Sequence, residues 1–507
     1  MHEIWADLQN GTDIRGVAIE VPDKTVNLTA EKAKYLAIGF AHWVSKTIKK
    51  EISSLRIAVG MDSRLSGDSL KAVFIEGLKS QGCTIYDCGM ATTPAMFMST
   101  LMNPYVCDGA VMITASHLPY YYNGLKFFTK TGGCEKEDIK AILELTAALD
   151  IGNAAEKSCV KKVALIDDYA NLLVDTIRKG VHSVKNADQP LLGCKIIVDA
   201  GNGAGGFFAA KVLEKLGANT EGSQFLEPDG TFPNHVPNPE NKEAIESIKA
   251  AVLHSHADLG IIFDTDVDRA AVVSADGTEI NKNALIALIS AIVLEEYPKS
   301  TIVTDSVTSI GLAEFIHHLG GVHHRFKRGY KNVINESKRL NEEGIESHLA
   351  IETSGHAALK ENYFLDDGAY LVAKILIKMA LLNEAGKSIQ SLIADLKMPA
   401  ESMDFRIGIK RHEFKVYGLS ILEALTDFVA DVDGWSLVPN NHEGVRVNVN
   451  RAEVKGWFLL RMSLHEPVLA LNVEADCSGG IKTIIQQLDE FFGRYEEIEL
   501  DAINKMR

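Results

Sequence analysis

Three apolar segments that each run directly into a polar loop constrain the fold of this chain most. They are GAVMITASH at 109–117, LGIIFDTDVD at 259–268 and HLAIETSGH at 348–356. Roughly 50 to 65 residues before each lies another apolar run that ends in an Asp or Gly turn and precedes a helical pattern, at 55–64, 194–203 and 301–308. Continuous apolar runs that alternate with helices are typical of buried parallel strands in α/β units. The repetition predicts three similar α/β modules.

The pattern changes after about residue 400. Short runs such as FRIGI, WSLV, VRVNVN, WFLLRMS and VLALNVEA indicate strands, and 420–429 and 480–492 have a helical pattern. This mixture is typical of an α+β module with an antiparallel sheet. We therefore predict an α/β chain of four domains, three similar mixed-sheet α/β modules followed by an α+β domain. The expected boundaries are 1–158, 159–278, 279–398 and 399–507.

Composition narrows the class of protein. Lys plus Arg total 52 and Asp plus Glu total 68, so the net charge of −16 argues against a nucleic-acid partner. The longest apolar stretch, 284–294, is shorter than the ~18 residues that span a bilayer, so no membrane partner is predicted. The acidic N-terminus does not resemble a signal peptide, and the seven cysteines form no C-x-x-C pair. We expect a cytoplasmic protein that acts on small molecules.

The second polar loop places three carboxylates at alternate positions after an apolar run. Asp264, Asp266 and Asp268 converge on one hard cation such as Mg²⁺ or Ca²⁺ if the loop curls. An EF-hand is excluded because its Gly and Glu positions are Arg269 and Ala275. The alternative is a solvated acidic turn. Arg269 beside the carboxylates favours a site where metal and phosphate meet.

The first polar loop carries Ser116 and His117, and Lys126 follows shortly after. A hydroxyl at a strand end, near an imidazole and an ammonium group, suits a nucleophile or a phosphate carrier. A Ser-His-Asp hydrolase is not favoured, because adjacent side chains point apart and no G-x-S-x-G elbow surrounds Ser116. On its own the pair also fits a cap or a turn.

Two further loops carry groups that suit a sugar phosphate. Glu352, Ser354 and His356 offer donors and acceptors for sugar hydroxyls, while Arg461 and Ser463 suit a phosphate. Ligands collect beyond the carboxyl ends of strands in such sheets, so the three α/β loops are expected to face one cleft. The further basic candidates are Arg15, Arg64, Arg325, Lys327, Arg328 and Lys331.

Together, and in this order, the loops resemble the α-D-phosphohexomutase superfamily, over nearly the whole chain. This superfamily includes phosphoglucomutases, phosphomannomutases and phosphoglucosamine mutases. Beside the four loops, the resemblance rests on 11–16 (GTDIRG), 60–64 (GMDSR), 123–126 (NGLK), 228–234 (PDGTFPN) with 237–239, 329–331 (GYK) and 367–368 (DG).

The resemblance implies a phosphoserine at Ser116 and a Mg²⁺ held by Asp264, Asp266, Asp268 and a phosphate oxygen on Ser116. The enzyme would interconvert hexose 1-phosphates and hexose 6-phosphates of glucose or mannose. The intermediate would be a hexose 1,6-bisphosphate, and glucose 1,6-bisphosphate or a related bisphosphate would be the activator. A monomer or a homodimer is expected.

The resemblance also implies roles for the remaining candidates. Arg15, Arg269 and Lys126 would neutralise phosphoryl charge, and Lys126 or His117 would move the proton. The residues that would bind the substrate are Glu352, Ser354, His356, Tyr330, Lys331, Arg461, Ser463 and His465.

Four other readings stay open. One is a phosphoglucosamine mutase. Another takes Asp264-x-Asp266 as an aspartyl-phosphate phosphatase site of the haloacid-dehalogenase kind, although Asp268 stands where that pattern has Thr or Val. A third is a non-catalytic sugar-phosphate sensor, suggested by Leu464-His465 where the family has Gly-Thr. The fourth is a structural scaffold.

Overall fold

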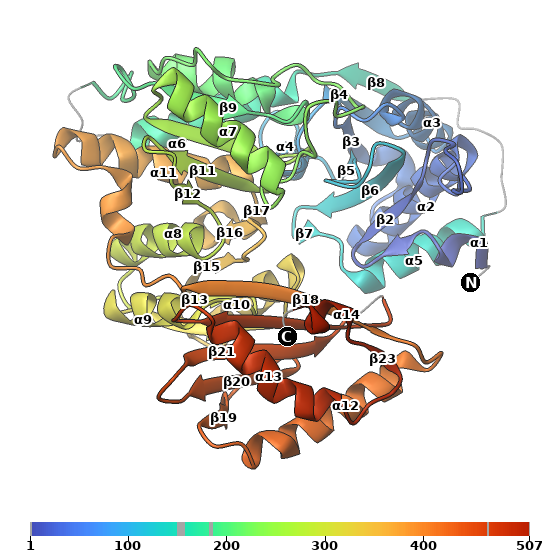
Figure 1. Cartoon of the computed structure of the whole chain (residues 1–507). Coiled ribbons are helices and arrows are strands. Elements are labelled where there is room, and N and C mark those ends of the chain that lie inside the picture. Colours follow the sequence, from blue (N-terminus) through green and yellow to red (C-terminus); the bar gives the residue numbers. More distant parts are fainter. Residues whose placement is uncertain (1–2, 150–157, 182–185, 464–465, 506–507) are drawn as a thin grey trace. The chain divides into compact units, whose positions relative to one another are not determined.

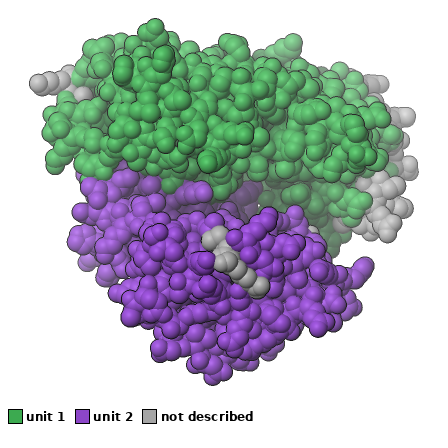
Figure 2. Space-filling model, viewed as in Figure 1, with its two compact units in different colours: residues 1–281, 354–391 green, residues 282–353, 392–507 purple. Residues whose placement is uncertain are grey.

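The computed structural model describes residues 3–149, 158–181, 186–463 and 466–505, which form two compact units (Figures 1 and 2). Unit 1 contains residues 1–281 and 354–391, and unit 2 contains residues 282–353 and 392–507. The chain therefore leaves unit 1, returns to it for one segment and ends in unit 2.

Unit 1 begins with a mixed sheet of order β1-β2-β6-β5-β3-β4-β8, with β7 beside β6 (Figure 1). Strands β5, β3, β4 and β8 are parallel, whereas β6 is antiparallel to both β5 and β2. The strands are β1 (Gln9–Asn10), β2 (Asp13–Val17), β3 (Arg56–Met61), β4 (Thr84–Met90), β5 (Gly109–Ile113), β6 (Tyr122–Thr129), β7 (Gly132–Gly133) and β8 (Cys159–Lys162).

Helices cover both faces of this sheet. Helix α2 begins after Thr29, whose hydroxyl accepts the Lys32 N–H, and it packs Phe40 on Phe127 of β6 with ring centroids 4.6 Å apart. Phe128 points to the opposite face, where it meets Phe97 of α4. The helices of this part are α1 (Glu3–Ala6), α2 (Ala30–Ile48), α3 (Gly67–Ser80), α4 (Thr93–Met98), α5 (Lys136–Ala147) and α6 (Leu165–Gly180).

A second sheet of unit 1 has the order β12-β11-β10-β9. Strand β10 is buried at every position because it lies between β9, which is parallel, and β11, which is antiparallel. The strands are β9 (Ile196–Asp199), β10 (Leu259–Phe263), β11 (Ala270–Ser274) and β12 (Glu279–Ile280), accompanied by α7 (Lys242–Ser255), the hairpin β16 (Ala357–Leu359) and β17 (Leu365–Asp366), and α11 (Gly368–Glu384).

One expected element differs in this part. The segment after 194–203 forms short 3-10 and π turns at Ala204–Gly206, Ala209–Leu213 and Glu214–Leu216 rather than one regular α-helix. Its start is rich in glycine, which disfavours helix, and a Cβ on Gly206 would lie 2.1 Å from the Leu226 carbonyl oxygen. The glycines that allow this close backbone packing also disfavour a regular α-helix here.

Unit 2 contains two layers of different kinds. Strands β14 (Val322–Arg325), β13 (Thr301–Thr304) and β15 (Ser347–Ile351) are parallel neighbours, with helices α8 (Asn283–Glu296), α9 (Ile310–His318) and α10 (Tyr330–Glu342). The C-terminal part is an antiparallel sheet of order β19-β20-β21-β22-β18-β23 with α12 and α13 on one face (Figure 1). Its elements are β18 (Glu401–Ile409), α12 (Phe414–Ala430), β19 (Trp435–Leu437), β20 (Val445–Asn450), β21 (Lys455–Met462), β22 (Val468–Ala475), α13 (Gly480–Phe492), β23 (Ile498–Glu499) and α14 (Asp501–Asn504).

The predicted fold class is confirmed: mixed α/β sheets are followed by an α+β region with an antiparallel sheet. The four boundaries stay a prediction. In the described ranges, no helix combines the length and the apolar character that crossing a bilayer requires.

One buried ion pair in unit 1 gives a pH-dependent prediction. The Nε2 atom of His235 lies 3.0 Å from Asp199 Oδ2. Burial lowers the pKa of His235, but the hydrogen bond and the charge of Asp199 outweigh burial and raise it above its usual value. The pair therefore stabilises the fold fully below the unfolded-state pKa of about 6.5, and this stabilisation is lost as the pH rises through the folded-state pKa. The gap in thermal midpoint between wild type and His235→Gln is expected to narrow from pH 6 to pH 9. The exposed His412→Gln variant serves as the control, and a gap that widens with pH would contradict the assignment.

Candidate active site

Ser116 lies in the loop between β5 and β6 and is almost fully buried. Its φ is +52°, in the left-handed region that a residue with a Cβ rarely adopts. Its Oγ lies 3.2 Å from Asp264 Oδ2, 3.3 Å from Arg269 Nη2 and 3.3 Å from His117 Nδ1. The hydroxyl thus faces a carboxylate, a guanidinium group and an imidazole at once.

The register of the first sheet brings two predicted cations to this loop. Strand β6 pairs Lys126 with Met112 of β5 and Gly124 with Arg15 of β2. The Lys126 ammonium group lies 2.8 Å from Asp266 and also contacts Asp268. Arg15 donates to the carbonyl oxygen of Ala115, the residue before Ser116. Both cations are therefore placed by strand pairing.

The metal loop, residues 264–269, is the tight connection of the β10–β11 hairpin, in which Phe263 pairs with Ala270. Each of Asp264, Asp266 and Asp268 offers an oxygen within 4.8 Å of the others, and all three are buried. Asp266 Oδ1 and Asp268 Oδ1 have no hydrogen-bond partner in the described ranges. Buried carboxylate oxygens without donors are what a divalent hard cation uses as ligands, so these residues fit Mg²⁺.

The pKa values of two aspartates in this loop are shifted far from their usual range, in opposite directions. Burial and the charges of Asp268 and Asp266 raise the pKa of Asp264 well above its usual value. Burial also disfavours ionised Asp268, but Lys126, His356 and Arg269 outweigh it and hold the pKa of Asp268 well below its usual range. The ionised form of Asp264 is therefore disfavoured by its neighbours, and a bound cation would favour it.

The two histidines of the site have opposite charge states. Burial, followed by the charges of Arg269 and Arg15, lowers the pKa of His117 to about 3, so its imidazole is neutral. Burial disfavours a charged His356, but Asp366 and Asp268 outweigh it and raise its pKa to about 9. His356 is therefore an imidazolium beside the metal loop, and the nearby Ser354 is buried.

Thr93 is a member of this site that the sequence analysis missed. It opens α4, and its hydroxyl donates to Asp266 Oδ2 while its N–H donates 2.9 Å to the Asp266 carbonyl oxygen. This contact orients the carboxylate so that Oδ1 is the atom left for a cation. No local signal marks Thr93, because its partner lies 173 residues further along the chain.

Removing this hydroxyl gives a prediction for metal affinity. Thr93→Val is expected to weaken Mg²⁺ binding roughly 10- to 100-fold, because the loss of a partner that orients a ligand carries a penalty of this size. The readout is the Mg²⁺ dependence of the thermal midpoint. Thr100→Val is the matched control, since the Thr100 hydroxyl is buried in the same region but donates to the Phe97 carbonyl. Equal Mg²⁺ affinity in both variants would contradict the role of Thr93.

The other predicted binding residues lie in unit 2. Glu352 accepts the Gly329 N–H at 2.6 Å, directly before Tyr330 and Lys331 at the start of α10. Arg461 of β21 lies 3.8 Å from Glu443, and the Ser463 N–H donates to the Val468 carbonyl oxygen. His465 lies outside the described residues. One cleft shared by all the loops stays a prediction.

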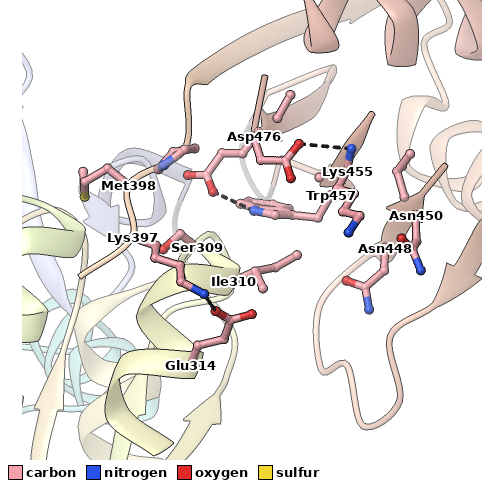
Figure 3. Close-up of a pocket in the computed structure, with 16 residues that line it drawn as sticks. Ser309, Ile310, Glu314, Lys397, Met398, Asn448, Asn450, Lys455, Trp457 and Asp476 are labelled. Carbon is pink, nitrogen blue, oxygen red and sulfur yellow. Dashed lines mark hydrogen bonds and ion pairs between the residues drawn. The ribbon is translucent and has the colours of Figure 1, made fainter. Parts of the chain in front are cut away.

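Figure 3 shows a separate pocket of about 410 Å³ within unit 2. It lies between α9, residues 397–399 and strands β20 to β22, and none of the predicted site residues lines it. Three of its charged groups already have partners in the lining: Lys397 donates to Glu314, and Glu474 accepts the Trp457 indole N–H. The pocket therefore presents few groups that need a ligand.

The chain is similar to known phosphoglucomutases and phosphomannomutases. Residues 7–151, 171–277 and 281–398 match the phosphoglucomutase/phosphomannomutase α/β/α domains I, II and III, respectively. The chain is 32% identical over 455 residues to a phosphomannomutase/phosphoglucomutase of Pseudomonas putida, covering 89% of this chain and 91% of that protein. It is 27% identical to a probable phosphoglucosamine mutase of Methanopyrus kandleri, covering 89% and 93%. A solved phosphoglucomutase/phosphomannomutase family protein from Burkholderia thailandensis superposes with a TM-score of 0.78 at 25% identity, covering 97% and 98%.

Proposed function

The chain belongs to the α-D-phosphohexomutase superfamily, and we propose that it is an isomerase that interconverts hexose 1- and 6-phosphates through a phosphoserine at Ser116. The observation that carries this proposal is the position of the Ser116 hydroxyl, 3.2 Å from Asp264 and 3.3 Å from Arg269. Nearby are two buried carboxylate oxygens, Asp266 Oδ1 and Asp268 Oδ1, without a hydrogen-bond partner among the described residues. The arrangement favours a phosphate carrier next to a cation site.

The proposed reaction consists of two phosphoryl transfers. A free hydroxyl of the hexose phosphate attacks the phosphorus on Ser116, the bond from phosphorus to Oγ breaks, and a hexose 1,6-bisphosphate forms. The other phosphate of the bisphosphate then returns to Ser116 Oγ and releases the isomeric monophosphate. The proton of the attacking hydroxyl passes to a neighbouring base and is returned to Ser116 Oγ as the bond from phosphorus to Oγ breaks, and it follows the reverse path in the second step. The proposed shuttle is His117, whose Nδ1 lies 3.3 Å from Ser116 Oγ, or Lys126 once its ammonium group has given up a proton.

The remaining groups of unit 1 neutralise charge. When bound, Mg²⁺ on Asp264, Asp266 and Asp268 would stabilise the negative charge on the transferring phosphoryl group. Arg269 and Arg15 hold their guanidinium groups at the same loop, and the His356 imidazolium adds a further positive charge. Such catalysis consists mainly of positioning and charge neutralisation.

Unit 2 supplies the residues proposed to hold the rest of the substrate. Arg461 and Ser463 would bind the non-reacting phosphate, and Glu352 would bind sugar hydroxyls. Because the sugar must bind in two opposed orientations, these binding residues have to accommodate a phosphate at either position of the sugar. Glucose and mannose phosphates are the proposed substrates. Glucosamine phosphates are the second candidate, because a probable phosphoglucosamine mutase is among the relatives.

A coupled assay tests the proposal. The protein is supplied with Mg²⁺, a trace of glucose 1,6-bisphosphate and, in turn, the 1-phosphates of glucose, mannose and glucosamine. Formation of the 6-phosphate from glucose or mannose at the highest kcat/KM supports the proposal. Faster turnover of the glucosamine phosphate would favour the second candidate. Binding without turnover of any of the three would overturn the mutase assignment and favour a sensor.

A further inference from the structure

Two motifs of the sequence have no role in the transfer described above, and the structure brings them together beneath the Ser116 loop. One is GMDSR at 60–64, at the end of β3, and the other is PDGTFPN at 228–234. Both lie in unit 1. Both motifs contact the guanidinium group of Arg64. The residue Arg64 is buried, with 2% of its surface exposed.

Arg64 holds the loop by its main chain. Its Nη1 donates to the carbonyl oxygens of Pro119 at 3.0 Å and Tyr122 at 2.9 Å. Its Nη2 donates to the carbonyl oxygens of Leu118 at 2.6 Å and of Ser116 itself. The four hydrogens of the two terminal nitrogens thus meet four carbonyls of residues 116–122. A planar fork with fixed donors can do this, whereas the single ammonium group of lysine cannot.

Asp62 links Arg64 to the other side of the loop. Its Oδ2 lies 3.4 Å from Arg64 Nε and accepts the Thr114 hydroxyl at 2.6 Å. Because the Thr114 hydroxyl donates its hydrogen to Asp62, Thr114 Oγ1 accepts a hydrogen bond from the Ser116 N–H at 2.9 Å. Ser116 is therefore held at its N–H through Thr114 and at its carbonyl oxygen by Arg64.

The second motif covers this arrangement. The Arg64 guanidinium carbon lies 5.3 Å from the centre of the Phe232 ring. A Cβ on Gly230 would lie 2.4 Å from both the Leu65 nitrogen and the Ser63 carbonyl oxygen, so only glycine lets this segment lie directly on the Arg64 backbone. The segment thus shields the Arg64 hydrogen bonds from water.

We propose that Arg64 is a positioning residue for phosphoryl transfer, acting with Asp62 and Thr114. The bonds described above hold Ser116 in its left-handed conformation, which directs Oγ toward Asp264 and Arg269. Arg64 does not have to touch the substrate, because all its hydrogen-bond donors on the terminal nitrogens face the loop. This inference rests on the proposed function, in which Ser116 carries the phosphoryl group.

The expected kinetic result is a fall in kcat without a matching rise in KM. Arg64→Lys keeps the charge but cannot form all four hydrogen bonds to the loop carbonyls. The loop and Ser116 Oγ are then expected to shift, and a small displacement of a reacting atom lowers the rate roughly 10- to 100-fold. The KM for glucose 1-phosphate is expected to change by less than about 3-fold, because the displaced groups act in the transfer and not in binding. Thr114→Val, which removes only the hydroxyl that holds the Ser116 N–H, is expected to shift kcat in the same direction.

Arg56→Lys is the matched control. Arg56 lies at the start of the same strand β3 and donates to the carbonyls of Pro104 and Tyr105, away from the Ser116 loop. This variant is expected to keep the kcat of wild type. A kcat of Arg64→Lys equal to wild type, a rise in KM alone, or an equal fall of kcat in Arg56→Lys would each overturn the proposal.

Hydrogen exchange separates this inference from the proposed function. Peptides that span 114–122 are expected to exchange faster in Arg64→Lys and in Thr114→Val than in wild type, with other peptides unchanged. This readout does not need turnover, so it remains decisive if wild type converts none of the sugar phosphates. Unchanged exchange at 114–122 in both folded variants would overturn the role of Arg64.

Discussion

Ser116→Ala is expected to abolish mutase turnover, with a fall in kcat of roughly 10⁴-fold or more, because the proposed phosphate carrier is lost. The fold should persist, since alanine occupies the left-handed position with the same Cβ and the loop keeps its main-chain bonds to Arg64 and Thr114. The measurement is the conversion of glucose 1-phosphate with Mg²⁺ and glucose 1,6-bisphosphate, together with the thermal midpoint.

Ser290→Ala is the control for this variant. Ser290 of α8 is fully buried, and its hydroxyl has no hydrogen-bond partner in the described ranges, so its removal tests the general effect of deleting a buried serine hydroxyl. Wild-type kcat is expected for this control. Turnover in Ser116→Ala within about 10-fold of wild type would exclude a phosphoserine at this position.

Removal of Mg²⁺ by EDTA is expected to lower turnover about 10³-fold or more, because cation stabilisation of a transferring phosphoryl group is worth several kcal/mol. Asp266 Oδ1 and Asp268 Oδ1 are buried and have no hydrogen-bond donor in the part of the chain that the structure describes, and the pKa of Asp264 is raised by burial and its neighbours. Added Mg²⁺ should therefore also raise the thermal midpoint of wild type, since it binds only the folded site.

The metal ligands are tested by a pair of variants. Asp266→Asn is expected to lose both the Mg²⁺-dependent stabilisation and most of the activity. Asp276→Asn alters an aspartate that lies between β11 and β12 of the same sheet and accepts the Thr278 N–H, so it should keep the response to Mg²⁺. Full activity in EDTA, or an unchanged Mg²⁺ response in Asp266→Asn, would contradict the metal assignment.

The features that could be predicted from the sequence are those with a local signal. Buried strands such as β10 are continuous apolar runs, and the sheet that α12 and α13 cover on one face is marked by short apolar runs and helical patterns. The alternate aspartates of 264–268 are recognisable because their spacing and their position after a strand both mark a cation site.

The features that could not be predicted depend on contacts between distant residues. The Thr93 hydroxyl finds Asp266 across 173 residues, and Arg64 reaches the carbonyls of the Ser116 loop across 52 to 58 residues. The return of 354–391 to unit 1, fastened by the Tyr169 hydroxyl on Asp367 at 2.6 Å, leaves no mark in local pattern. Propensity and periodicity describe neighbours along the chain, whereas these contacts are set by tertiary packing.

The most direct test of the central claim is to follow the phosphoryl group itself. The Mg²⁺-loaded protein is incubated with glucose 1,6-bisphosphate labelled with ³²P, digested and analysed by peptide, with and without a chase of unlabelled glucose 1-phosphate. We expect label on the peptide that contains Ser116, its loss to the sugar during the chase, and no label in Ser116→Ala. A protein that converts glucose 1-phosphate to the 6-phosphate while Ser116 stays unlabelled would contradict the account.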